Sequence, residues 1–387
     1  MKKFVNSSAC VPSCLIFILA LSLLLMGCGF SQKDAPPPKP TVPENASLDE
    51  KVDAMVASMT LKEKIGQMVM IGIHGTDVTE DSLFMLHQYH IGGIILYDRN
   101  MESQEQVRLL NAHLQEQAQE KLPLFIGVDE EGGLVARMKD ALPPPPSEQE
   151  IGETGNPENA RIWAAKTAVA LKGIGFNLNF APVADLGMER GRSYGNDPAS
   201  VTEFVREAAN GYEQEGLIYC LKHFPGLGKS VVDTHRDMSV INVPIATLQE
   251  EDLLPFRTLI TEKNPENYFI LISHAIYPAL DDESPSSVSP IIQTALLRQE
   301  LEYQGVIITD DIAMGAVSKL YTPGELALKA VEAGTDIVLS CHEYQNSTEV
   351  YLKLLEAVEQ GKIKEERINE SVKRIVRVKL AHLAKTN

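Results

Sequence analysis

The chain has 387 residues, with 53 Asp and Glu against 35 Lys and Arg, and a formal net charge of −18 at pH 7. This acidic balance argues against nucleic acid as a partner, because nucleic-acid-binding proteins concentrate positive charge. The sequence contains no Cys and His spacing typical of a zinc site and no glycine-rich phosphate loop. We therefore expect neither a metal nor a cofactor.

The N-terminal segment has the composition of an export signal followed by a tether. An apolar run over residues 15–26, about 12 residues long, is typical of a secretory signal and is short for a membrane span of roughly 20 residues. Leu25-Met26-Gly27-Cys28 resembles the bacterial lipobox, which implies a signal peptide over residues 1–27 and a lipid on Cys28. An ordinary cleaved signal peptide or an uncleaved anchor is the alternative. Residues 28–47 are rich in proline, which favours a semi-rigid tether.

These features predict an exported bacterial lipoprotein that is anchored to a membrane, either at the outer membrane and periplasm or at the cell surface. The folded domain is then expected over residues 48–387. That length is large for one core, but α/β barrels are commonly built as one domain of this size.

Eight strand-like segments recur along the domain, separated by helical patterns. They are rich in Val, Ile and Leu without strict alternation, as parallel strands covered on both faces should be. The segments are residues 68–73, 93–97, 124–128, 177–183, 217–221, 269–273, 306–309 and 337–340. Helical patterns cover residues 104–119, 157–174, 202–215, 255–261, 292–301, 323–333 and 365–383, and Thr60 with Glu63 forms a capping box. This alternation predicts an α/β fold, a (β/α)8 TIM-like barrel, with an open doubly wound sheet as the alternative.

Polar residues follow successive strand segments, where the strands of a barrel all open to one mouth. In chain order they are Asp129 to Glu131, Asp185 and Arg192, Lys222 and His223, His274, and Asp310 with Asp311. Each has an ordinary explanation by itself, such as a helix cap, a core histidine or a solvated turn. Their recurrence at the strand ends favours a site for a polyhydroxylated ligand.

Residues 222–235 concentrate the chemistry of the chain. Pro225, Gly226 and Gly228 disfavour a helix there, so we predict a loop. At its end, Asp233 and His235 can place a carboxylate beside an imidazole, and that pairing makes a tuned proton donor.

At this point several motifs in series resemble glycoside hydrolase family 3, in its single-barrel β-N-acetylglucosaminidase (β-N-acetylhexosaminidase) branch. The resemblance covers about residues 48–380. It is carried by Val-Asp-Glu-Glu-Gly-Gly at 128–133, Asn-Phe-Ala-Pro-Val-Ala-Asp-Leu at 179–186, Arg-Ser-Tyr-Gly at 192–195, Lys-His-Phe-Pro-Gly at 222–226, Asp-Thr-His at 233–235 and Gly-Val-Ile-Ile-Thr-Asp-Asp-Ile-Ala-Met-Gly at 305–315.

The resemblance implies a retaining exo-enzyme that removes terminal β-linked N-acetylglucosamine from peptidoglycan fragments or chitin-type oligosaccharides. Asp310 would be the nucleophile that forms a covalent glycosyl intermediate, and Asp233 and His235 the acid/base pair. Lys222 and Arg192 would help to keep Asp310 ionised. The residues expected to bind substrate are Asp129, Arg192, Lys222, His223, Met314 and His274.

Other functions remain open. An imidazole donor adds no negative charge, so it tolerates phosphate as an acceptor, and the protein could be a β-N-acetylglucosaminide phosphorylase. A non-catalytic sugar-binding lipoprotein is the alternative from another class. The β-glucosidase branch is a weaker alternative, because its enzymes usually take their acid from a further domain. One departure from the branch is Leu227, where a His is usual, which leaves the contribution of that side chain to the loop or to the leaving-group side in question.

Overall fold

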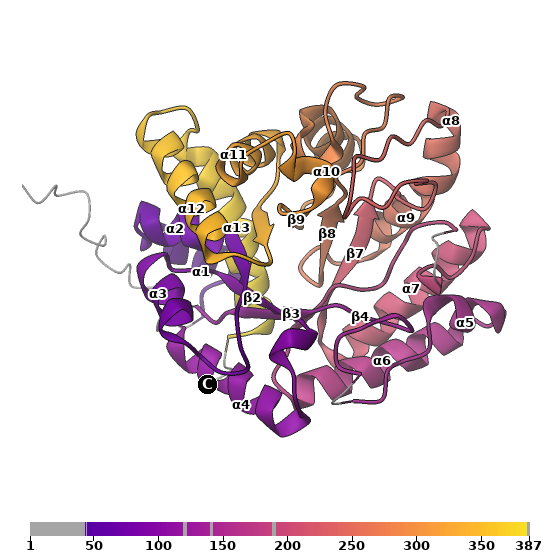
Figure 1. The fold of residues 1–387 in the computed structure, drawn as a ribbon, viewed down its shortest axis with the longest axis horizontal. Coiled ribbons are helices and arrows are strands. Elements are labelled where there is room, and N and C mark those ends of the chain that lie inside the picture. Colours follow the sequence, from indigo (N-terminus) through magenta and orange to yellow (C-terminus); the bar gives the residue numbers. More distant parts are fainter. Residues whose placement is uncertain (1–42, 44, 119–121, 140–141, 188–190, 385–387) are drawn as a thin grey trace, which may run out of the picture. The chain divides into compact units, whose positions relative to one another are not determined.

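The fold is an eight-stranded parallel barrel enclosed by helices (Figure 1). The computed structural model describes residues 43, 45–118, 122–139, 142–187 and 191–384. The barrel closes in the order β1-β10-β9-β8-β7-β6-β3-β2, because Met70 of β1 pairs with Gly93 of β2 on one side and with Leu339 of β10 on the other. The predicted (β/α)8 architecture is therefore confirmed, and the open doubly wound sheet is excluded. The barrel strands are β1 (Val69–Gly72), β2 (Gly93–Leu96), β3 (Phe125–Val128), β6 (Leu178–Asn179), β7 (Ile218–Phe224), β8 (Tyr268–Ile272), β9 (Val306–Asp311) and β10 (Ile337–Ser340).

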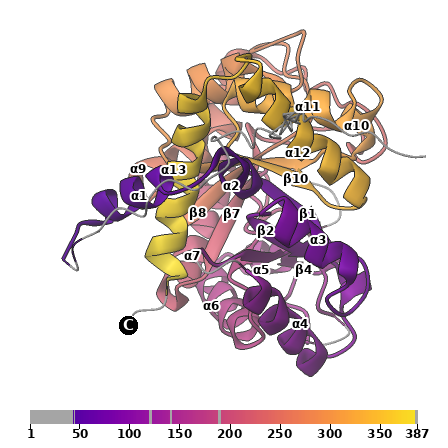
Figure 2. The ribbon, with the colours of Figure 1, turned by 90° about the vertical axis from the view of Figure 1, so that its left-hand side faces the viewer.

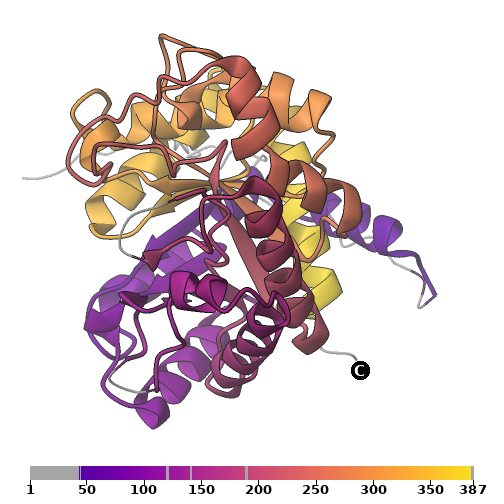
Figure 3. The same ribbon diagram turned by 90° about the vertical axis from the view of Figure 1, so that its right-hand side faces the viewer.

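Helices cover the outside of the barrel, with α6 and α7 packed together on one flank (Figure 3) and α1 beside α13 on another (Figure 2). The α-helices are α1 (Leu48–Ala57), α2 (Leu61–Gln67), α3 (Glu80–Gln88), α4 (Gln104–Gln117), α5 (Glu148–Glu153), α6 (Glu158–Gly173), α7 (Pro198–Glu215), α8 (Ile245–Thr247), α9 (Leu254–Glu262), α10 (Gly315–Ser318), α11 (Pro323–Ala333), α12 (Tyr344–Glu359) and α13 (Glu365–His382). The predicted capping box begins α2: Thr60 N and Oγ1 donate to Glu63, whose own N donates back to Thr60.

The strands bury both of their faces, which explains their apolar sequences. Every residue of β1, β2, β3, β7, β8 and β10 is buried. One face fills the barrel interior and the other packs against the surrounding helices, so an alternation of apolar and polar residues has no physical basis here. The amphipathic helix α13 buries Ile368, Val372, Ile375 and Val376, the side predicted from its pattern.

Several boundaries differ from the prediction, and two of the differences affect the site. Strand β7 continues to Phe224 and β9 to Asp311, so Lys222, His223 and Asp310 lie on strands, whereas loops were expected. Strand β6 is only two residues long, because the chain leaves the ladder before Pro182, which has no N–H to donate. Helix α7 begins four residues before the predicted segment, where Asp197 caps it.

Other elements carry weak sequence signals and were not predicted. The hairpin of β4 (Glu130–Gly132) and β5 (Val135–Ala136) is too short to show a pattern. Helix α12 starts without a side-chain cap. Short 3-10 and π-helical segments complete the fold: η1 (Asp98–Asn100), η3 (Leu248–Asp252), η4 (Ser286–Val288) and η5 (Ile291–Glu300). The last of these is the π-helical form of a segment expected to be an α-helix.

The predicted signal peptide and the lipidation site at Cys28 lie outside the described residues, as does most of the tether. Over the part of the chain that the structure describes, none of the helices combines the length and hydropathy needed to cross a bilayer.

Candidate active site

Two adjoining cavities open at the carboxyl ends of the strands. The inner cavity, about 350 Å³, lies at the barrel mouth and is lined by Asp129, Lys222 and Met314 among others. The outer cavity, about 300 Å³, lies along the loop that carries Asp233. Asp310, His235, Arg192 and His223 line both. The residues expected to do chemistry therefore lie where the two cavities meet.

Asp310 and Asp311 end the same strand but have different surroundings. Asp311 is buried, and both of its carboxylate oxygens have partners. Oδ1 accepts hydrogen bonds from the backbone N of Cys341 (3.0 Å) and Ala313 (3.2 Å), and Oδ2 lies 3.2 Å from Nε2 of His342. Burial opposes ionisation of Asp311, but the contact with His342 and these amides lower its pKa below the ordinary value. Asp310 is half-buried, lines both cavities and accepts one hydrogen bond, from its neighbour's backbone N at 2.9 Å. Asp310 is the carboxylate available to a ligand.

The Asp233 and His235 pair forms as the sequence predicts. Nδ1 of His235 lies 2.9 Å from Oδ1 of Asp233, which also accepts the backbone N of His235 at 3.0 Å. These contacts lower the pKa of Asp233, so it remains a carboxylate beside the ring. The His235 side chain is 70% exposed. Because Nδ1 is held by Asp233, Nε2 is the nitrogen left to exchange a proton with a ligand.

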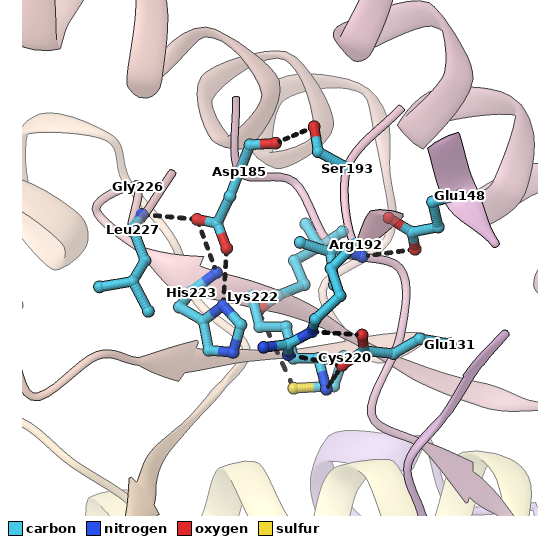
Figure 4. A network of polar contacts seen from close by, with 12 residues as sticks. Glu131, Glu148, Asp185, Arg192, Ser193, Cys220, Lys222, His223, Gly226 and Leu227 are labelled. Carbon is cyan, nitrogen blue, oxygen red and sulfur yellow. Dashed lines mark hydrogen bonds and ion pairs between the residues drawn. The ribbon is translucent and has the colours of Figure 1, made fainter. Parts of the chain in front are cut away.

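A buried network of four charges forms one wall of the inner cavity. Nζ of Lys222 contacts Asp129 at 2.7 Å and Glu131 at 2.6 Å. Arg192 donates from two nitrogens to the two oxygens of Glu131, each at 2.8 Å, in the bidentate geometry visible in Figure 4. Burial penalises the Glu131 charge, but Lys222 and Arg192 together hold the pKa of its carboxyl well below the usual range. Both cations are ion-paired within this network and neither is ion-paired with Asp310, so their expected effect on Asp310 stays a prediction.

A second buried glutamate lies close to this network, and its pKa is shifted in the opposite direction. Oε1 of Glu148 accepts the backbone N of Val183 at 2.9 Å, and Oε2 has no partner among the described residues. Burial, together with repulsion from Glu131, raises the pKa of Glu148 well above its ordinary value. Burial and the Glu131 charge therefore favour the neutral form of Glu148.

His223 is oriented by Asp185, a residue that the sequence placed at a strand end without a role. Nδ1 of His223 lies 2.6 Å from Oδ2 of Asp185, and Oδ1 accepts the backbone N of His223 (3.2 Å) and of Leu227 (2.6 Å) (Figure 4). Ser193 Oγ in turn donates to the Asp185 backbone oxygen at 2.6 Å. Asp185 thus ties the end of β7 to the start of the following loop.

Leu227, which stands where the branch usually has a His, is buried. Its side chain is only 5% exposed, packs into the core and lines the outer cavity, while its backbone N supplies the contact to Asp185. The next glycine is required by space, since a Cβ on Gly228 would lie 1.8 Å from the Leu186 carbonyl oxygen. The loop path thus depends on backbone contacts at this point, and Leu227 makes the cavity floor apolar.

Two further predicted residues differ in their placement. Met314 is buried and lines the inner cavity as expected. His274 does not line either cavity: it is fully buried, with Nδ1 2.7 Å from Oγ of Ser287 and Nε2 3.0 Å from the Asp311 backbone oxygen. Burial also lowers its pKa. The geometry assigns His274 to holding the end of β9 in place and not to contact with substrate.

Part of the inner cavity wall consists of residues that were not predicted from the sequence. Tyr97, Arg137 and His342 line it, and the His342 ring stacks on Tyr97 with centroids 5.9 Å apart. His342 follows β10 and could have been found by the strand-end rule that found the others. The role of Glu131 depends on a short hairpin that places it against Arg192, and the sequence carries no signal for that contact.

The mouth of the outer cavity is aliphatic. Leu134, at the tip of the β4–β5 hairpin, is 74% exposed, and Val231, in the loop before Asp233, is 90% exposed. Val232 and Leu227 line the same cavity, and its lining among the described residues contains no Phe, Tyr or Trp. A group bound here would meet branched alkyl side chains and not a flat stacking surface. Among the described residues, no group of three His, Cys, Asp or Glu side chains is arranged to hold a metal ion.

An eight-stranded barrel with an available carboxylate and a histidine–aspartate pair at the carboxyl ends of its strands defines an enzyme of the glycosidase type. Residues 60–378 match the glycosyl hydrolase family 3 N-terminal domain. The chain belongs to glycosyl hydrolase family 3.

Its relatives carry names from one part of that family. Over 332 residues it is 33% identical to beta-hexosaminidase A of Pseudoalteromonas piscicida, covering 76% of this chain and 54% of that one. Over 287 residues it is 33% identical to a beta-hexosaminidase of Xylella fastidiosa (strain 9a5c), covering 71% of this chain and 83% of that one. The solved glycoside hydrolase family 3 beta-N-acetylglucosaminidase from Paenibacillus sp. str. FPU-7 gives a TM-score of 0.81 at 36% identity, covering 85% of this chain and 64% of that one. The chain thus spans about half the length of the first relative and most of the second.

Proposed function

We propose that this protein is a retaining exo-β-N-acetylglucosaminidase, which removes terminal β-linked N-acetylglucosamine from peptidoglycan fragments or chitin-type oligosaccharides. The observation that carries the proposal is the position of Asp310 and His235, which line both cavities at their junction. A sugar in the inner cavity and its leaving group in the outer cavity would place the scissile bond between them. The names of the relatives supply the sugar type.

The reaction follows from these two side chains. An ionised Asp310 attacks the anomeric carbon while protonated His235 donates its proton to the departing glycosidic oxygen, which gives a covalent glycosyl–Asp310 ester and a free alcohol. Neutral His235 then takes a proton from a water molecule that attacks the same carbon and releases Asp310. Two inversions give net retention. Asp233 orients the ring, because its carboxylate lies 2.9 Å from Nδ1.

The inner cavity can hold the sugar hydroxyls and the acetamido group. Asp129 and Glu131 accept hydrogen bonds, Lys222 and Arg192 donate them, and burial makes these contacts stronger than in water. His223, oriented by Asp185, adds a ring nitrogen that lines both cavities. Because the charges are paired before a ligand arrives, little reorganisation is needed on binding.

The first test is proton NMR of the initial product from a chromogenic β-N-acetylglucosaminide, with and without phosphate. Free β-anomer in both samples supports a retaining hydrolase. A sugar 1-phosphate that appears only with phosphate would identify a phosphorylase. Glycan binding without turnover of any glycoside would identify a binding protein. Asp310→Asn, which removes the charge with little change of shape, should abolish turnover and leave sugar binding measurable by calorimetry; residual hydrolysis near the wild-type rate would contradict the nucleophile assignment.

We also propose that the chain is exported and anchored through Cys28, which the lipobox-like sequence supports. In a bacterial host, the full chain should incorporate labelled fatty acid and fractionate with membranes. Cys28→Ser should abolish labelling and release active enzyme into the soluble fraction. Unlabelled wild-type protein would contradict the anchor while leaving the enzymatic proposal intact.

A further inference from the structure

The loop that carries the Asp233 and His235 pair rests on the segment that follows Met314. The backbone N of Gly315 donates to the His235 backbone oxygen at 3.1 Å, and the N of Ala316 donates to the Thr234 oxygen at 3.2 Å. These two residues begin α10, directly after Met314, which lines the inner cavity. The same short segment therefore forms part of the inner cavity wall and supports the loop of the proton donor.

Lys319 adds side-chain contacts one residue beyond α10. Its Nζ donates to the Arg236 backbone oxygen at 2.9 Å and lies 3.3 Å from Oδ1 of Asp237. Both residues directly follow His235, so Lys319 clamps the turn just after the histidine. The Lys319 and Asp237 side chains are 57% and 65% exposed, and an exposed pair contributes little to global stability.

Polar contacts, more than apolar packing, hold this loop. Val231 is 90% exposed and Asp233, His235 and Arg236 are exposed. At the base of the loop, Oγ of Ser230 lies 2.6 Å from Oγ of Ser239, which is fully buried. A segment held in this way can leave its position without unfolding the domain. Loss of one contact should therefore change the position of His235 more than the stability of the barrel.

Gly315 makes the approach of the loop possible. A Cβ at this position would lie 2.5 Å from the Arg236 backbone oxygen and 2.9 Å from the His235 oxygen. The obstacle would be the loop itself. An alanine at 315 would push away the turn that holds the proton donor.

We propose that Lys319 and Gly315 are positioning residues for the proton donor: they hold the turn 233–237 on α10 so that His235 lies at the junction of the cavities. The proposal rests on the proposed function, in which His235 is the general acid. A misplaced donor weakens proton transfer and leaves the nucleophile untouched, because a shift of about 1 Å in a catalytic group can cost on the order of a hundredfold in rate. The effect should therefore depend on how much help the leaving group needs.

The test compares kcat/KM, which reports formation of the glycosyl intermediate, for two β-N-acetylglucosaminides. A 2,4-dinitrophenyl leaving group departs without a proton, whereas a second sugar needs one. In Lys319→Met we expect kcat/KM for the disaccharide to fall about five- to tenfold, the loss expected for one charged hydrogen bond with its ion pair. The dinitrophenyl value should change by less than about twofold. Lys319→Arg should restore most of the loss, and Gly315→Ala should show the same selectivity with a larger loss.

The matched control is Lys373→Met on α13, which removes an ion pair of similar exposure: Nζ of Lys373 lies 2.7 Å from Asp53, and the two side chains are 49% and 63% exposed. This control variant should leave kcat/KM unchanged for both substrates. If Lys319→Met lowers kcat/KM equally for both substrates, or for neither, the positioning role is overturned. Failure of the proposed function is seen separately: wild type would then turn over neither substrate, or His235→Ala would show no dependence on the leaving group.

Discussion

Two neighbouring buried glutamates, of which Glu131 lines the inner cavity, should respond in opposite ways to the same substitution. Glu131 is held ionised between Lys222 and Arg192, whereas burial and the nearby charge favour the neutral form of Glu148. Replacement of Glu131 by Gln removes a charge that is ion-paired with both Lys222 and Arg192. Replacement of Glu148 by Gln keeps an oxygen for the Val183 backbone N and resembles the favoured neutral form of the acid. Glu148→Gln is therefore a matched control for Glu131→Gln.

The expected magnitude follows from the contacts. Glu131 has a side chain 1% exposed and binds its cations at 2.6 and 2.8 Å. Breaking a buried ion pair by removing one partner costs about 3–5 kcal/mol, out of a total free energy of unfolding of roughly 5–15 kcal/mol. Glu131→Gln should thus fold at 25 °C with strongly reduced stability. Because Arg192 then loses its bidentate partner, we expect kcat/KM to fall about a hundredfold.

Urea denaturation and kcat/KM measured from pH 4 to 8 test this pair of substitutions. The low pKa of Glu131 in the folded state stabilises the fold at any pH above the ordinary pKa of a carboxyl group. This stabilisation is lost as the pH falls below that ordinary value, so the difference in the free energy of unfolding between Glu131→Gln and the wild type should narrow near pH 4. The raised pKa of Glu148 acts in reverse: its charge costs stability as pH rises, so Glu148→Gln should equal or exceed the wild type at pH 8. Equal losses for both variants at pH 7 would refute the assigned charge states.

Three further substitutions test other parts of the site. Asp311→Asn weakens the contact to His342 at 3.2 Å that helps to hold the end of β9, so kcat should fall about tenfold with little change in KM; loss of activity as complete as in Asp310→Asn would point to Asp311 as the nucleophile. Val231→Ser removes an exposed alkyl group from the outer cavity, so KM should rise about two- to threefold for aglycones with an alkyl substituent and stay constant for a methyl glycoside. Burial lowers the pKa of Lys379 to about 7, while the unfolded chain keeps the ordinary value. Urea titrations should therefore show a free energy of unfolding that rises above pH 7, and Lys379→Met should remove the rise. Parallel profiles of this free energy against pH for the two proteins would contradict the prediction.

The barrel could be predicted because each strand is short, apolar and bounded by turn residues, and because the helices around the strands have amphipathic faces and some of them, such as α2 and α11, begin with capping boxes. What could not be predicted were the points where a strand ends in polar residues. Lys222 and His223 belong to β7, and Asp310 to β9, although their side chains are typical of loops. Their backbones continue the ladder while their side chains turn to the mouth of the barrel. Local propensity disfavours such residues on strands, but tertiary contacts pair Lys222 with Asp129 and His223 with Asp185, and Asp310 is the exception that has no ion pair among the described residues.

For the site, the sequence predicted which residues take part better than it predicted which residues they contact. Strand-end position placed Asp129, Lys222 and Asp310 at one mouth, because parallel strands share a direction. The partners depend on loops that cross between strands. Arg192 reaches Glu131 from a loop after β6, and no spacing in the sequence encodes that distance. His274 was misplaced for the same reason: a histidine after a strand can face the mouth or the core, and only its contacts with Ser287 and the Asp311 backbone oxygen decide.

The balance of charge at the barrel mouth bears on the proposed role of Asp310 as nucleophile. Lys222 and Arg192 carry two positive charges, and Asp129 and Glu131 carry two negative charges, so this network is neutral by itself. The pKa of Glu148, the further acid nearby, is raised by burial and by the Glu131 charge, which favours its neutral form. The network can therefore bind a neutral sugar without requiring a counter-charge from it, and no cation among the described residues is ion-paired with Asp310. A positive charge that develops at the anomeric carbon in the transition state would then be the strongest electrostatic partner that Asp310 meets, so its attraction is greater for the transition state than for the bound sugar, as catalysis requires.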